Sequence, residues 1–259
     1  MASLLTEYRA SPAEQHRIAD LFLLIPSSGT NAIDIGARDC YLAQKLAERF
    51  EKVVALDLES PDVQHPGIEP IAGNVVSLPF GDSHFDAVLC AEVLEHIPED
   101  LLVKACSEIS RVAKDKVVIG VPYRQDLRCG RTTCQNCGKS NPPWGHVNSF
   151  DENRLKALFG TLVLERVSFV GASKDSTNWL SAALLDYAGN PFGTWEQEEP
   201  CVYCGASIGE PGERSMSQRL ATRLAFILNK LQSRFVKPRG NWIHVLFSKP
   251  PMRNEKLVT

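Results

Sequence analysis

The sequence lacks any long uninterrupted run of apolar residues. No window approaches the roughly 18 apolar residues that a membrane-spanning helix requires, and the first residues, MASLLTEYRASPAEQ, carry no basic stretch ahead of an apolar core. Both absences argue against a transmembrane segment and against secretion. We therefore expect a cytoplasmic protein whose eight cysteines are thiols, since disulfide frameworks belong to small exported domains.

An excess of positive charge is also missing. The formal net charge is −3, with 44% hydrophobic and 23% charged residues, which is the balance of an ordinary folded domain. A nucleic-acid-binding protein normally shows a strongly basic domain or stripe, so the overall charge argues against that partner class. Internal repeats and low-complexity tracts are absent as well.

Short apolar runs alternate with amphipathic segments along the chain. This alternation predicts an α/β fold with a Rossmann-like, mostly parallel sheet and helices on both faces. The regularity fails over 171–213, which is rich in Gly, Pro, Ser and acidic residues. Strands are expected at 32–36, 53–57, 68–73, 85–90, 116–121, 161–171 and 241–249, and helices at 12–25, 41–50, 98–113, 150–159 and 215–235.

Acidic residues and a glycine stand where the first two strands end. Asp34 and Gly36 close the first strand and Asp57 closes the second, so the sheet would bring them to one crevice. Gly36 permits close approach of a ligand, and Asp57 can accept hydrogen bonds from two ribose hydroxyls. Strand ends commonly carry Asp and Gly for turns alone. A dinucleotide site is disfavoured, because Arg38 and Cys40 interrupt the GxGxxG pattern.

The segment GNVVSLPFGDSHFDAVLCAEVLEHIPE, residues 73–99, resembles the class I S-adenosylmethionine-dependent methyltransferases, particularly the subgroup with the quinone-biosynthesis enzymes. The resemblance implies one methyltransferase domain over 1–259, with a seven-stranded sheet whose last strand is antiparallel. It also implies S-adenosylmethionine as cofactor. The residues that it places around the cofactor are Asp34, Gly36, Ala37, Asp57, Leu58, Asn74, Val75, Cys90 and Glu92.

This sequence departs from the family pattern at the later glycine positions, where it has Arg38 and Cys40. Larger side chains there leave less room near the methionine moiety. Methyl transfer from a sulfonium is an in-line displacement, and a base is needed only if the acceptor must lose a proton. Glu95, His96 and His146 are the catalytic candidates, although Glu95 and His96 suit a structural or cofactor-side role equally well.

Two CxxCG motifs form the second constellation. Cys134, Cys137, Cys201 and Cys204 have the spacing of two zinc knuckles, which together make a closed, structural four-sulfur Zn²⁺ site. Cys129 or His146 remains an alternative ligand. The motifs lie in two zinc-binding insertions, 123–149 and 171–213, which are expected at the cofactor end of the sheet, where the metal would shape the acceptor pocket.

A basic amphipathic helix is predicted within 214–240. Residues 215–240 contain six Lys and Arg residues and no Asp or Glu, beside an apolar stripe that includes Leu220, Leu224 and Ile227. Such a helix can bind anionic lipid as a peripheral contact, or hold a phosphorylated or lipid-linked acceptor. Helices of this kind more commonly pack on their own domain.

These features favour one function over two alternatives. The favoured function is transfer of a methyl group from S-adenosylmethionine to an O or N atom of a small-molecule acceptor, for example a saccharide or another secondary metabolite. The first alternative is a non-catalytic partner protein that keeps the fold and docks through the zinc insertion. The second is an RNA methyltransferase, against which the acidic balance of the chain argues.

Overall fold

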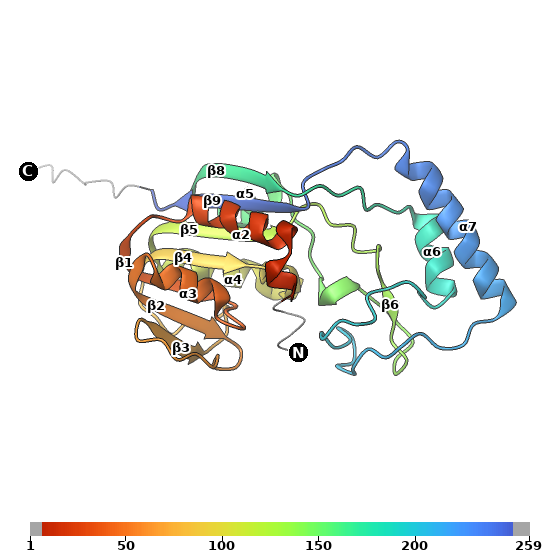
Figure 1. Cartoon of the computed structure of the whole chain (residues 1–259), viewed down its shortest axis with the longest axis horizontal. Helices are drawn as coiled ribbons and strands as arrows, with labels where there is room; N and C mark the ends of the chain where they lie inside the picture. Colours follow the sequence, from red (N-terminus) through yellow and green to blue (C-terminus); the bar gives the residue numbers. More distant parts are fainter. Residues whose placement is uncertain (1–6, 251–259) are drawn as a thin grey trace, which may run out of the picture. The chain divides into compact units, whose positions relative to one another are not determined.

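The computed structural model describes residues 7–250. It divides into two compact units, each described here by itself (Figure 1). The first unit takes its residues from Met1–Val121, Asp151–Gly171 and Trp242–Thr259, and the second from Pro122–Phe150 and Ala172–Asn241. Both cysteine-bearing insertions and the basic helix therefore belong to one compact unit.

The first unit is built on a seven-stranded sheet in the order β3-β2-β1-β4-β5-β9-β8. Strands β1 to β5 pair in parallel, and β9 runs antiparallel to β8, so the predicted Rossmann-like sheet with an antiparallel last strand is confirmed. The strands are β1 (Gly29–Ile35), β2 (Phe50–Asp57), β3 (Ile68–Ala72), β4 (Phe85–Ala91), β5 (Ala113–Pro122), β8 (Val163–Val170) and β9 (Trp242–Ser248).

Helices cover both faces of this sheet. Helices α2 (Pro12–Leu24) and α3 (Tyr41–Ala47) lie on one face, while α4 (Glu99–Val112) and α5 (Glu152–Leu158) lie on the other (Figure 1). Central strands covered on both sides bury apolar residues at successive positions, as β4 does from Ala87 to Ala91. Leu21 of α2 and Leu46 of α3 are part of the resulting core.

The strand order reverses at the centre of the sheet. From β1 the chain proceeds outward to β2 and β3, then returns to place β4 on the other side of β1. In open α/β sheets, ligands bind outside the carboxyl ends of the strands at such a reversal. The residues that follow β1 and β4 are therefore the first place to look for a site.

The second unit contains little regular structure besides two helices. Strands β6 (Thr132–Thr133) and β7 (Ser140–Asn141) form a short antiparallel hairpin, followed by the single turn η2 (Pro143–Gly145). Helices α6 (Trp179–Tyr187) and α7 (Met216–Ser233) pack against each other.

Several elements differ from the sequence prediction: β1 and β2 begin three residues before the predicted strands, and β5 begins at Ala113. Helix α6 falls inside the stretch that was expected to be irregular. Its sequence, WLSAALLDY, is apolar on most sides and so lacks the polar face that indicates a helix. The Asn178 side chain caps the helix by accepting a hydrogen bond from the amide of Ser181. Helix α3 ends at Ala47 because the next strand already begins at Phe50. Among the described residues, no helix is long and apolar enough to cross a membrane.

Candidate functional site

Gly36 brings the loops after β1 and β4 into contact. Its φ of +81° lies in the left-handed region, and a Cβ built there would approach Val93 Cγ2 to 2.3 Å. The amides of Gly36 and Ala37 both donate to the carbonyl of Leu56, at 2.8 and 3.1 Å. The contact with Val93 therefore requires glycine at this position, and the loop is anchored to β2; the close approach of a ligand to Gly36 stays a prediction.

Asp57 at the end of β2 faces the same loop. Its carboxylate accepts hydrogen bonds from the amides of Arg38, at 2.8 Å, and Leu58, at 2.7 Å. A carboxylate offers about four acceptor positions, so about two remain free for further donors. That capacity fits a pair of vicinal hydroxyls.

The two positions that depart from the family glycine pattern keep left-handed backbone. Arg38 has a φ of 45° and Cys40 a φ of 58°, a region that residues other than glycine adopt at a cost of about 1–3 kcal/mol. The Cys40 side chain is fully buried in the core, whereas Arg38 is exposed. The substitution therefore preserves the loop conformation and adds only the Arg38 side chain at the surface.

Asp34 is buried beside this loop. One of its carboxylate oxygens, Oδ2, forms no hydrogen bond to any residue that the structure describes. Burial raises the pKa of Asp34 to about 7, against a smaller opposing effect of the main-chain hydrogen bond from Ala43. A cationic or donor group beside Oδ2 would therefore be stabilised, which makes Asp34 a suitable neighbour for a charged ligand.

The residues expected around the adenine differ in exposure. Leu58 and Asn74 are exposed, whereas the Val75 side chain is buried. The Asn74 side-chain oxygen accepts a hydrogen bond from the amide of Val76 at 3.1 Å, and the main-chain carbonyl of Asn74 accepts one from the amide of Ser77 at 2.9 Å. Cys90 is fully buried too, main chain included, so its place beside the cofactor stays a prediction.

A buried charge network that the sequence did not reveal surrounds Glu92. Arg17 of α2 donates twice to Glu14, at 2.7 and 2.8 Å, and its Nη1 lies 3.8 Å from Glu92 Oε1. The Trp242 indole donates to Glu92 Oε2 at 3.2 Å. The Glu14 carboxylate binds Arg9 as well as Arg17, while its amide donates to the Ser11 side chain at 3.3 Å.

Glu95 and His96 lie together in η1 (Leu94–His96), directly after β4. Burial raises the pKa of Glu95 well above its usual range, and neither of its carboxylate oxygens hydrogen-bonds to another described residue. Burial and the Arg38 charge lower the pKa of His96 to about 4. At neutral pH, therefore, His96 is a neutral imidazole that can accept a proton.

His146, the third catalytic candidate, belongs to the second unit. It follows η2, and its Nδ1 lies 2.6 Å from Gln125 Oε1, which fixes the ring orientation within that unit. This contact accounts for one of the two ring nitrogens.

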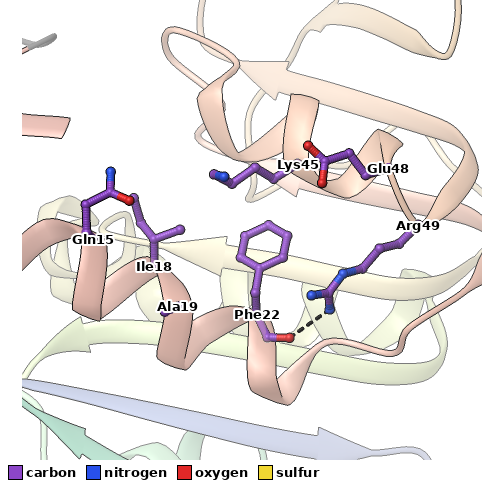
Figure 2. Close-up of a pocket in the computed structure, with 7 residues that line it drawn as sticks. All are labelled: Gln15, Ile18, Ala19, Phe22, Lys45, Glu48 and Arg49. Carbon is purple, nitrogen blue, oxygen red and sulfur yellow. Dashed lines mark hydrogen bonds between the residues drawn. The ribbon is translucent and has the colours of Figure 1, made fainter. Parts of the chain in front are cut away.

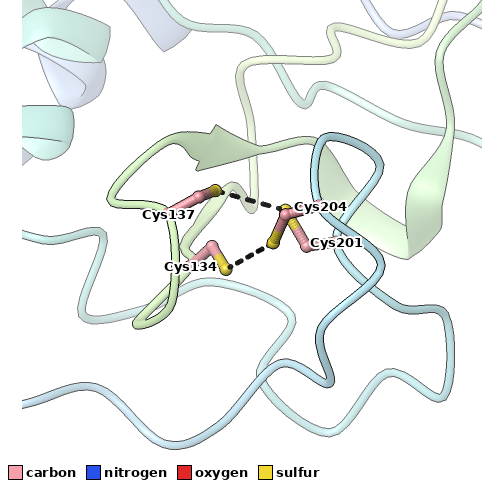
Figure 3. A group of neighbouring side chains, drawn as sticks. All are labelled: Cys134, Cys137, Cys201 and Cys204. Atoms are coloured by element: carbon pink, nitrogen blue, oxygen red, sulfur yellow. Dashed lines mark hydrogen bonds between the residues drawn. The ribbon is translucent and has the colours of Figure 1, made fainter.

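The four cysteines of the CxxCG motifs converge in the second unit (Figure 3). All four sulfurs lie within 4.8 Å of one another, with Cys134–Cys204 at 3.7 Å and Cys137–Cys201 at 3.8 Å. Sulfurs at the corners of a tetrahedron with bonds of about 2.3 Å to zinc stand about 3.8 Å apart. The geometry and the donor set both fit Zn²⁺, and neither Cys129 nor His146 is part of the group.

The two knuckles have the same local conformation. Gly138 donates to the carbonyl of Cys134, and Gly205 to that of Cys201, both at 2.8 Å, and each glycine has a φ of +71°. Nothing would contact a Cβ at either glycine, so the left-handed turn alone explains the residue type. The side chain of Asn136 also donates to Cys204 Sγ at 3.5 Å.

Each unit contains a cavity. A cavity of about 180 Å³ lies between α2 and α3, where Arg49 donates to the carbonyl of Phe22 (Figure 2); it contains none of the predicted site residues. A larger cavity of about 530 Å³ lies entirely within the second unit. Its lining includes four cations and two aromatic rings, namely Arg128, Arg131, Lys174, Lys230, Phe192 and Phe226.

Comparison with known proteins supports the same interpretation. Residues 33–119 match the methyltransferase domain family. The matched segment is about a third of the chain. It runs from Ile33 in β1 to Ile119 in β5 and includes both sides of the strand reversal and every predicted cofactor contact.

Curated relatives match only parts of their own length. A probable S-adenosylmethionine-dependent methyltransferase of Mycolicibacterium smegmatis is 25% identical over 162 residues, which cover 60% of this chain and 58% of the relative. An uncharacterized protein of Methanocaldococcus jannaschii is 48% identical over 46 residues, 18% of this chain and 19% of that protein.

Solved structures share the fold of the methyltransferase domain. A putative methyltransferase from Bacillus halodurans C-125 superposes with a TM-score of 0.57 at 14% identity, over 90% of this chain and 98% of that one. The N-methyltransferase NodS from Bradyrhizobium japonicum WM9 gives a TM-score of 0.52 at 14% identity, over 93% and 99%. At these identities the likeness concerns the fold.

The raised pKa of Asp34 predicts a pH dependence of stability. A carboxyl with a higher pKa in the folded than in the unfolded protein favours folding while protonated, and this contribution is lost as pH rises from about 4 through about 7. Asp34→Asn should remove the effect. Urea unfolding at a series of pH values should show the wild type losing several kcal/mol relative to the variant across that range. A difference that stays constant with pH would contradict the assignment.

Proposed function

We propose that this protein transfers a methyl group from S-adenosylmethionine to an oxygen or nitrogen atom of a small molecule. The observation that carries the proposal is the convergence of Gly36, Asp57 and Glu92 at the strand reversal of the methyltransferase domain. The probable function of the M. smegmatis relative agrees with it.

Acidic side chains and exposed residues of the first unit would bind S-adenosylmethionine. Asp57 keeps about two acceptor positions for the ribose hydroxyls, and exposed Leu58 and Asn74 lie beside it for the adenine. Asp34 and Glu92 would face the end that carries the ammonium and sulfonium groups, where a bound cation would favour their ionised forms. The cofactor supplies the methyl group as an electrophile, and the protein supplies alignment.

The acceptor side uses a base only where the acceptor must lose a proton. His96, with its pKa lowered to about 4, is unprotonated at neutral pH and can accept a proton, while burial raises the pKa of Glu95 and so favours its protonated form. His146 is the further candidate for orienting the acceptor. The cavity of about 530 Å³ in the second unit has the size of a small-molecule site, which supports that class of acceptor.

A structural Zn²⁺ held by Cys134, Cys137, Cys201 and Cys204 is the second part of the proposal. Four sulfurs fill the tetrahedral coordination of zinc, which leaves no position for water or substrate. Val202 donates to Asn141 Oδ1 at 2.9 Å, so the second knuckle is also tied to the β6–β7 hairpin that carries the first. The metal would therefore cross-link the second unit and perform no methyl-transfer chemistry.

Asp57→Asn tests the donor site. Losing the charge that receives the ribose hydroxyls should weaken S-adenosylmethionine binding by about 10- to 100-fold, since a hydrogen bond to a charged group contributes about 1.5–3 kcal/mol. Isothermal titration calorimetry of the purified, zinc-loaded protein measures this directly.

Glu59→Gln is the matched control, because Glu59 is exposed and lies two residues along the same loop. It should bind S-adenosylmethionine like the wild type. Failure of the folded wild type to bind the cofactor at all would instead favour a non-catalytic partner protein that retains the fold.

Cys134→Ser tests the metal site. Metal analysis of the wild type, purified without added zinc, should give about one equivalent, and the variant should lose it together with much of its thermal stability, because binding energy at a structural zinc site is folding energy. Cys129→Ser provides the control, since Cys129 lies outside the cluster and should leave the zinc content unchanged. Equal zinc loss in both variants would contradict the assigned ligand set.

A further inference from the structure

Helix α7 packs on α6 through its small residues. Ala221, Thr222 and Ala225 are its buried positions. Hydrogen bonds join Asn178 to Gln232 at one end of the pair and Tyr187 to Ser217 at the other, so the two helices run antiparallel. The large apolar side chains of α7 are not among its buried positions.

The large apolar side chains of α7 face outward instead. They recur at the spacing of one helical face, and Phe235 extends the row just beyond the helix, 87% exposed. This contradicts the common expectation that such a stripe packs on its own domain. Met216, Leu220, Leu224, Ile227 and Leu231 are 79, 67, 46, 57 and 49% exposed.

Positive charge borders this stripe on one side. At about 100° per residue, Arg219, Arg223, Lys230 and Arg234 fall within an arc of about 60° that adjoins the apolar face. All four are exposed. No Asp or Glu occurs between residues 214 and 250, although the chain as a whole has a formal charge of −3. The segment is thus a local concentration of positive charge in a mildly acidic protein.

Aromatic side chains gather at one end of the helix pair. Trp179 opens α6 and is 75% exposed; its neighbour Asn178 donates to Gln232, three residues before Phe235. Exposed Trp and Phe beside Lys and Arg suit the boundary between lipid headgroups and acyl chains. A protein partner would need a surface patch that is both acidic and apolar. An anionic bilayer has both properties over its whole surface, with anionic headgroups outside and acyl chains beneath them.

We propose that α7 is a membrane-surface anchor that lies on an anionic bilayer, with Met216, Leu220, Leu224, Ile227, Leu231 and Phe235 buried among the lipids. The flanking cations contact the headgroups. No described helix spans a membrane, so the contact is peripheral and reversible.

Vesicle flotation of the full-length protein tests the anchor. The protein should float with vesicles of phosphatidylcholine and phosphatidylglycerol and stay unbound with phosphatidylcholine alone, and added salt should weaken the binding. Leu224→Asp combined with Ile227→Asp should reduce the partition coefficient at least about tenfold, because two side chains lose their lipid contact.

Charge variants separate the two contributions. Arg223→Gln and Arg234→Gln should each reduce binding about fivefold, the factor that corresponds to ~1 kcal/mol per cation near the surface. The matched controls lie in the first unit: Leu23→Asp on α2 removes an apolar side chain that is 74% exposed, and Lys156→Gln on α5 removes an exposed cation. Both should bind vesicles like the wild type.

Three results would overturn the proposal. They are absence of flotation with either lipid, equal binding to both lipids, and undiminished binding by the α7 variants. Sedimentation velocity tests the main alternative, in which the stripe is an interface between two copies of the chain. A dimeric wild type together with a monomeric Leu224→Asp, Ile227→Asp variant would favour that interface over the membrane anchor. Circular dichroism checks that every variant remains folded.

Discussion

The reversal of strand order between β1 and β4 is the constraint on which the first unit depends. Because the chain moves outward to β3 and then returns, the loops after β1 and β4 cannot be covered by a crossover helix between them. Gly36 and Val93 occupy that opening at contact distance, and a side chain at Gly36 would force the loops apart. The hydrogen bonds from Arg38 and Leu58 then aim the Asp57 carboxylate at the same opening.

A buried guanidinium holds the other side of this opening. Arg17 connects Glu14 of its own helix with Glu92 after β4, and Trp242 adds a bond from β9, so three separate parts of the chain meet at one carboxylate. Removing one partner from a buried ion pair costs about 3–5 kcal/mol, because the remaining charge is left uncompensated in a poorly hydrated site. Glu92 therefore serves the architecture of the opening as well as its negative charge.

Local chemistry explains which of these features could be predicted from the sequence. Strands β1, β2, β4 and β5 could be predicted because a sheet covered on both faces needs short apolar runs in the sequence. The CxxCG spacing likewise predicts that the two sulfurs of each pair face a common centre. The ion pair of Arg17 with Glu92 could not be predicted, because Glu92 is distant in sequence and only the fold brings it to Arg17. Helix α6 was missed because a helix without a polar face has no periodicity to detect.

The second unit lacks the large buried sheet that stabilises the first unit. Its only strands are two residues long, and α7 turns its largest apolar side chains toward solvent while packing through Ala221, Thr222 and Ala225. A unit that leaves so much apolar surface outside its own core gains little from burial and needs another source of cohesion. Four sulfurs in tetrahedral positions, which bring the loop before α7 to the hairpin after β5, are suited to provide it. If the metal stabilises the second unit, the outer face of α7 is not needed for its core and is available for a contact outside the chain. The proposed zinc site and the proposed anchor therefore both follow from the small apolar core of this unit.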